Sequence, residues 1–225
     1  NFVLLMFTYV LVYILEKTFG YLSPITLVEL SNINTGLLKK LSENCPGTFQ
    51  HSLQVSILAS AAASEIGANA QLARTGAMYH DIGKMSNPIY FTENQSGVNP
   101  HSSLSYEDSA KYIISHVTEG VKIAEKASLP KEIIDFIRTH HGQGKAKYFY
   151  NSYRNKYPGK PIDESIFTYP GPNPFTKETA IVMMADAVEA VSRSLKEHTE
   201  EGISALVNKI IDGQIADGLL KNAPL

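Results

Sequence analysis

The chain lacks several features that would indicate common functional classes. Its single cysteine, Cys45, excludes a disulfide framework and a cysteine-rich zinc site, and suits a reducing compartment. The 20 basic residues are balanced by 22 acidic ones, so no excess of positive charge is available for binding a nucleic-acid polymer. Internal repeats and low-complexity runs are also missing. A chain of 225 residues can nevertheless bury a substantial core, as one large domain or two small ones.

Strand patterns are missing as well, whereas apolar residues recur at helical spacing along most of the chain. We therefore predict an all-α fold. A short amphipathic helix is expected within residues 25–47, a loop over 85–103, and an aromatic, proline-rich lid with one short helix over 144–174. The longer predicted helices cover residues 48–66, 70–80, 106–116, 131–141, 177–195 and 203–211. The helix over 48–66 should bury Leu53, Ile57, Leu58, Ala61 and Ala62 on one face.

The first fifteen residues carry no charged side chain. As a helix they would span roughly 22 Å, which is short of the roughly 30 Å hydrocarbon core of a bilayer. Because the chain begins with Asn rather than Met, we interpret residues 1–17 as the end of a truncated transmembrane helix. Residues 18–47 would then be a linker helix region, and 48–225 the main domain. The alternative is a buried or homodimer-forming helix of the soluble domain.

Polar, titratable residues on the predicted inward faces are the most informative feature. Five of the seven histidines lie in or beside predicted helices near the apolar side, as do two aspartates: His51, His80, Asp81, His116, His140, His141 and Asp186. A lone inward histidine is usually a hydrogen-bonded core residue, but seven such groups need compensation together, and metal ions provide it.

These residues can be divided between two ions. His51, His80, Asp81 and Asp186 supply four ligands to one ion, while His116, His140 and His141 could hold a second, with the Asp81 carboxylate bridging both. The ligand types suit two divalent transition-metal ions, iron or manganese, and leave zinc open. Lys84, three residues after Asp81, could bind a phosphate oxygen in the transition state, or could be a solvated charge at a helix end.

The ordered set His51…His80-Asp81…Asp186 resembles the H…HD…D signature of the HD phosphohydrolase superfamily. Its surroundings, "PGTFQHS", "YHDIGK", "HHG" and "MMADAVEA", are similar to the C-terminal domain of the seven-transmembrane HD proteins of bacteria, the PgpH type. The resemblance implies an HD-domain helical bundle that hydrolyses cyclic di-AMP to linear pApA through a hydroxide bridging two metal ions. It also implies attachment to the cell membrane, with the catalytic domain on the cytoplasmic side.

The resemblance also bears on substrate choice. The related HD-GYP proteins, which act on cyclic di-GMP, carry a Glu and a later Gly-Tyr-Pro after the histidine pair, where this chain has "GQG" at 142–144. Cyclic di-AMP is therefore favoured. Candidate substrate contacts, which could equally be turn-forming or packing residues, are Lys84, Asn94, Gln95, Asn99, Tyr148 and Arg193.

Three alternatives stay open from the sequence alone. The domain could be an HD hydrolase of another nucleotide, namely cyclic di-GMP, a linear dinucleotide or a mononucleotide. It could be a non-catalytic nucleotide-sensing module, although such a module would be expected to lose ligands. The histidines could also be satisfied core residues.

Overall fold

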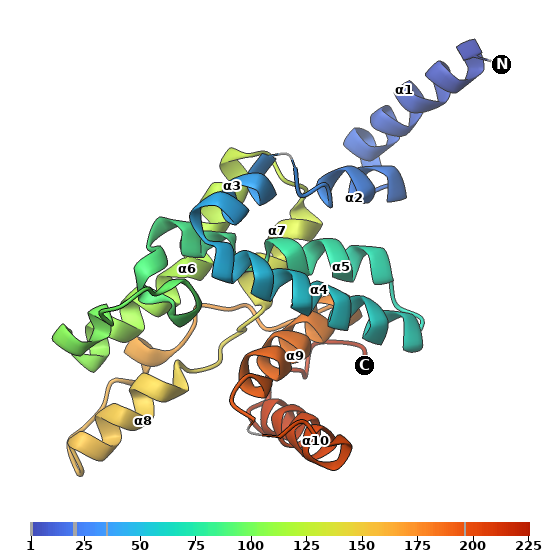
Figure 1. Ribbon diagram of the computed structural model, residues 1–225. Helices are drawn as coiled ribbons and strands as arrows, with labels where there is room; N and C mark the ends of the chain where they lie inside the picture. Colours follow the sequence, from blue (N-terminus) through green and yellow to red (C-terminus); the bar gives the residue numbers. More distant parts are fainter. Residues whose placement is uncertain (1, 20–21, 35, 196) are drawn as a thin grey trace.

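The computed structural model describes residues 2–19, 22–34, 36–195 and 197–225, which are helical over most of their length (Figure 1). Over these ranges the extended pairing is limited to one isolated bridge between Lys145 and Thr168. The all-α prediction is confirmed. The α-helices are α1 (Phe2–Phe19), α2 (Pro24–Leu30), α3 (Gly36–Asn44), α4 (Pro46–Glu65), α5 (Ala70–Tyr79), α6 (Tyr106–Lys126), α7 (Lys131–Thr139), α8 (Lys147–Lys156), α9 (Lys177–Ser192) and α10 (Glu200–Ala216). Short 3-10 helices are η1 (Ile82–Ser86), η2 (Pro88–Tyr90), η3 (Thr92–Asn94), η4 (Pro100–Ser103) and η5 (Glu164–Phe167).

Local capping signals explain where several of these helices begin. The side chain of Asn69 accepts a hydrogen bond from Leu72 N and so caps α5, and Ser105 caps α6 in the same way. Thr176 opens α9 with a reciprocal capping box. These three predicted helix starts are confirmed.

The core is built where α4 packs against α5 and α9. One apolar cluster joins α4, α5 and α9 through Val55, Ala77 and Val182. A second cluster joins α3 and the end of α5 to α7 through Leu41 and Tyr79. The end of α5 contributes to both clusters, so the residues that follow it are held between two packed regions.

The buried face of α4 differs from the predicted one. Ile57 is 53% exposed and Leu58 is 43% exposed, whereas Ala59 and Ser56 on another face are fully buried. The prediction assumed that the largest apolar side chains mark the inner face. The structure instead packs small residues there, which lets α4 approach α5 and α9 closely and turns the side chain of His51 inward.

Two other helix predictions are wrong in detail. Residues 25–47 form two helices, α2 and α3, rather than one, and Leu27, Leu38 and Leu41 pack in the core. Helix α5 ends at Tyr79, before His80, and continues as the tighter turn η1. A 3-10 turn has fewer residues per turn than an α-helix, so the side chains beyond Tyr79 are redirected.

Helix α1 extends away from the other helices (Figure 1). Met6, Phe7 and Val10 on it are more than half exposed. Within the described residues, no helix combines the length and hydropathy required to cross a membrane.

Candidate metal centre

Asp81 lies at the middle of the predicted ligand set. It follows the last turn of α5 and is 1% exposed. Its Oδ2 atom lies 3.6 Å from His51 Nε2 and 3.3 Å from His80 Nε2. Its Oδ1 atom lies 3.3 Å from His116 Nε2 and 3.6 Å from His140 Nε2. The two carboxylate oxygens therefore face two different groups of imidazoles, which is the arrangement that a bridging ligand requires.

The first group joins α4, the end of α5 and α9. His51 Nε2 lies 2.9 Å from Asp186 Oδ1, and His80 Nε2 lies 3.7 Å from the same oxygen. His51, His80 and Asp81 offer ligand atoms that all lie within 4.8 Å of one another. Helix packing thus brings together four groups of metal-ligand type that are up to 135 positions apart in sequence.

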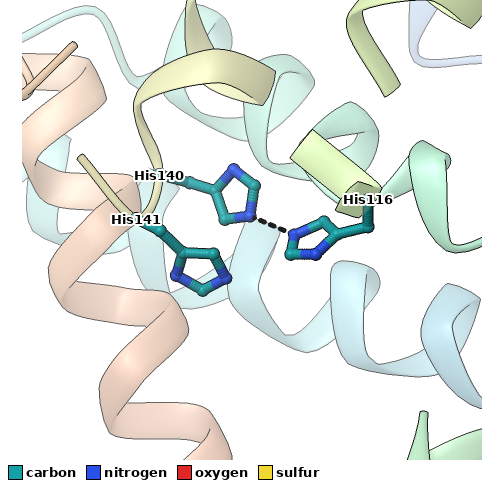
Figure 2. Close-up of side chains that lie close together, drawn as sticks. All are labelled: His116, His140 and His141. Carbon is teal, nitrogen blue, oxygen red and sulfur yellow. Dashed lines mark hydrogen bonds between the residues drawn. The ribbon is translucent and has the colours of Figure 1, made fainter. Parts of the chain in front are cut away.

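The second group consists of His116 on α6 with His140 and His141 just after α7, as Figure 2 shows. Their ligand atoms also lie within 4.8 Å of one another. Nδ1 of His116 donates a hydrogen bond to Ile113 O at 2.6 Å, and Nδ1 of His140 donates to Ile137 O at 2.8 Å. These bonds orient both rings and leave each Nε2 atom pointing toward the centre, as is typical of metal-ligating histidines.

The close approach of two imidazole nitrogens indicates that a cation belongs at this centre. Nε2 of His116 and Nε2 of His140 are 3.0 Å apart, the contact dashed in Figure 2. Because both Nδ1 atoms carry the proton, both Nε2 atoms of the neutral rings present lone pairs, which repel each other. His80 Nε2 and Asp81 Oδ1 are buried and have no hydrogen-bond partner among the residues that the structure describes. The donor set and these unpartnered atoms fit divalent metal ions.

The charge state of the metal-free centre follows from burial and from the carboxylates. Burial lowers the pKa of His116, and lowers that of His140 well below its ordinary value. Burial alone would lower the pKa of His80 too, but the carboxylates of Asp81 and Asp186 outweigh it and raise that pKa to about 10. His80 is therefore protonated at neutral pH without metal, while His116 and His140 are neutral.

Metal binding is therefore expected to release protons. At pH 7.5 an ion must displace the proton of His80, whose pKa is about 10, and any proton on His51, whose pKa is also raised. The second group has little to release, because its pKa values are lowered. Titration calorimetry with Mn²⁺ in two buffers of different ionisation enthalpy should give about one to two protons released, and affinity should rise with pH. Release of no proton would contradict this charge assignment.

Glu189 is a member of the centre that the sequence interpretation missed. His51 Nδ1 donates to Glu189 Oε2 at 2.5 Å, and Arg193 donates to Glu189 Oε1 from Nε at 2.8 Å and from Nη2 at 2.6 Å. The carboxylate orients the His51 ring and increases its basicity, as an outer-shell partner does. A signal was available, because Glu189 lies three residues after Asp186 on the same face of α9.

Lys84 lies beside the centre but is already engaged. Its Nζ atom is 2.7 Å from Asp81 Oδ2 and 2.8 Å from Glu93 Oε1. Burial alone would lower the pKa of Lys84, but these two carboxylates outweigh it and raise that pKa, so the ammonium stays charged. The solvated-charge alternative is wrong, since the side chain is only 13% exposed.

Four of the other predicted substrate contacts are engaged in their own loops or exposed, and none of them lines the cavity described below. Asn94 exchanges hydrogen bonds with Thr48, at 3.1 Å and 2.8 Å, and holds the loop against the start of α4. Gln95 Nε2 donates to a carbonyl in the same loop, and Asn99 caps η4. Tyr148 is 74% exposed. The geometry does not favour these four as contacts, and their predicted role stays a prediction.

A cavity of about 990 Å³ opens above the two histidine groups. Ligand-type residues His51, His116, His140, His141 and Asp186 line it, together with Lys84 and Arg193. Tyr169 also lines it, and its ring packs 4.3 Å from that of His141. The cavity is large enough for a ligand of nucleotide or dinucleotide size to reach the centre.

Comparison with known families decides the membership of the chain. The family model described as HD domain matches residues 48–191. The chain belongs to the HD-domain family. All seven predicted ligands fall inside the matched segment of this HD domain, whereas α10 follows it.

Individual relatives support a closer relationship. The chain is 45% identical over 211 residues to the cyclic-di-AMP phosphodiesterase PgpH of Bacillus subtilis, covering 93% of this chain and 29% of that protein. The PgpH of Listeria monocytogenes is 44% identical over 204 residues, covering 90% and 28%. A crystal structure of the Listeria PgpH HD domain in complex with cyclic-di-AMP is 42% identical, with a TM-score of 0.81 over 87% of this chain and 91% of that one. The chain thus spans less than a third of the two curated PgpH relatives.

Proposed function

We propose that this HD domain is a phosphodiesterase that hydrolyses cyclic di-AMP to linear pApA. The observation that carries the proposal is the convergence of seven side chains of metal-ligand type around Asp81, five of which line a cavity of dinucleotide size. The similarity to PgpH proteins over nearly the whole chain, including a structure with cyclic-di-AMP, supports the choice of substrate.

We assign the following roles in the reaction to residues of the chain. The first group and the second group would each hold one divalent ion, iron or manganese by ligand type, and Asp81 would contact both. When bound, such ions supply an activated water and neutralise phosphate charge. The oxygen of water would add to one phosphorus atom while the bond between that phosphorus and the 3′ oxygen breaks. The proton lost by the water would pass to the leaving 3′ alkoxide, which becomes a hydroxyl. The product is linear and keeps its 5′ phosphate.

Lys84 would stabilise negative charge on the phosphate. We expect Lys84→Ala to lower kcat by about 10- to 1,000-fold, because one charged contact to the transition state is lost. Steady-state kinetics on cyclic di-AMP with Mn²⁺ would measure this, with metal content measured in parallel. An unchanged kcat would show that Lys84 only balances the charges of Asp81 and Glu93.

The substrate assignment is tested by comparing two cyclic dinucleotides. Cyclic di-AMP and cyclic di-GMP would be supplied separately to the purified chain with Mn²⁺, with Asp81→Ala as the blank. Preferential production of pApA that depends on Asp81 is expected. If the protein binds metal but cleaves neither substrate, the proposed metal centre is retained and the substrate assignment is wrong.

We further propose that α1 is the last part of a transmembrane helix, which holds the domain at the cytoplasmic side of the cell membrane. The exposed apolar side chains of Met6, Phe7 and Val10 support this, since lipid would cover them. The chain should partition with membranes, and a variant without residues 1–17 should not. A soluble homodimer of the whole chain would favour the alternative, in which α1 pairs with a second copy.

A further inference from the structure

The cations around the cavity are not equivalent. Among the residues that the structure describes, five basic ones line it: Lys84, Lys145, Lys147, Arg193 and Lys209. Four of them form ion pairs with carboxylates at 2.5 to 2.8 Å. Lys84 pairs with Asp81 and Glu93, Lys145 with Glu164, Lys147 with Asp217, and Arg193 with Glu189. Lys209 has no carboxylate partner within the part of the chain that the structure describes. Of these five described cations, Lys209 is therefore the one whose charge is left for a ligand to balance.

Lys209 belongs to a wall that faces the cavity from α10. Leu206, Lys209, Ile210 and Gly213 all line the cavity and recur at helical spacing, so they form one stripe of this helix. Leu206 and Ile210 are half-buried. The stripe therefore presents one positive charge between two apolar side chains, a combination suited to a phosphate attached to a nucleoside.

The α10 wall is fixed in place from both sides. Gln214 Nε2 donates to Met183 O of α9 at 3.3 Å. Lys147 at the start of α8 pairs with Asp217, just after α10, at 2.8 Å. Because α9 carries Asp186, the hydrogen bond from Gln214 connects α10 directly to the helix that supplies a predicted metal ligand.

We propose that Lys209 binds the second phosphate of a cyclic dinucleotide, the one that is not being cleaved, and that Leu206 and Ile210 contact the adjoining adenosine. The inference rests on the proposed function. A cyclic dinucleotide carries two phosphodiester anions, and only one of them can lie at the metal centre at a time. The other needs a cation elsewhere in the cavity, and of the five lining cations that the structure describes Lys209 is the one without a carboxylate partner. Since the HD-domain match ends at residue 191, this contact comes from an element outside it.

The test compares a substrate with two phosphates and a substrate with one. Lys209→Gln removes the charge and keeps most of the length of the side chain. We expect KM for cyclic di-AMP to rise by about 10-fold or more, with kcat within about twofold, because a charge-assisted contact is lost in binding. Hydrolysis of bis(4-nitrophenyl) phosphate, which has a single phosphate, should be unchanged. Lys221→Gln, an exposed lysine beyond the cavity lining, is the matched control, and Lys209→Arg should restore most of the affinity.

Two results would overturn the inference. The first is an unchanged KM for cyclic di-AMP in Lys209→Gln. The second is an equal loss on both diesters, which would mean that Lys209 supports the centre rather than the second phosphate.

Failure of the proposed function would look different. The wild-type chain would cleave the single-phosphate diester and leave cyclic di-AMP intact. The proposed contact of Lys209 would then be tested by equilibrium binding of labelled cyclic di-AMP. Lys209→Gln should weaken this binding by about 10-fold. Absence of binding to the wild type, or equal binding to both proteins, would overturn the inference.

Discussion

Replacing Asp81 with alanine is expected to remove both metal ions from the centre and to lower phosphodiester hydrolysis by at least about 100-fold. Loss of an outer-shell partner alone costs roughly 10- to 100-fold in metal affinity or activity, and we propose Asp81 as a direct ligand. Its Oδ2 atom faces His51 and His80, and its Oδ1 atom faces His116 and His140. In the proposed two-ion centre, this single substitution would therefore remove a ligand from both ions.

Metal stoichiometry distinguishes this prediction from a simple loss of stability. Asp81→Ala and the wild type would be titrated with Mn²⁺, and bound metal would be counted after gel filtration. Asp108→Asn, an exposed aspartate in the first turn of α6, is the matched control and should bind as the wild type does. Loss of only one ion from a folded Asp81→Ala protein would show that the carboxylate does not bridge.

Most of the fold was predictable because its signals are local. Asn69, Ser105 and Thr176 cap their helices through their own side chains and the next turn of backbone. The inner face of α4 was not predictable in the same way. It depends on which residues allow close approach of α5 and α9, and there small and polar residues displaced Ile57 and Leu58 from the core.

The candidate site also contains residues that could be predicted from the sequence and residues that could not. The histidines and aspartates stood out because charged or polar groups on inward faces need partners, and the structure brings all seven together. The loop residues Asn94 and Asn99 gave no comparable signal. An asparagine in a loop can bind a ligand or hold a turn, and the choice depends on tertiary neighbours such as Thr48. Glu189 was missed because a carboxylate near a helix end has an ordinary solvent-exposed interpretation.

The second large effect is expected at Gly83, in the turn that follows Asp81. A Cβ atom there would overlap the carbonyl oxygen of His116 and lie 2.5 Å from the backbone nitrogen of Gly120. Both are backbone atoms of α6, so neither can rotate away, and η1 must separate from α6. Since Asp81 precedes η1 and His116 belongs to α6, this shift would pull the Asp81 carboxylate away from the second group of histidines.

We therefore expect Gly83→Ala to destabilise the protein by about 1–3 kcal/mol, the usual cost of overpacking, and to lower activity by about 100-fold, the cost of roughly 1 Å of misplacement. Urea denaturation would measure the first effect and steady-state kinetics the second. Gly213→Ala on α10 is the stability control, because its Cβ would meet open space and alanine favours a helix. A Gly83→Ala protein with wild-type stability and activity would mean that η1 and α6 tolerate separation. The close glycine contact would then not be what sets the distance between Asp81 and His116.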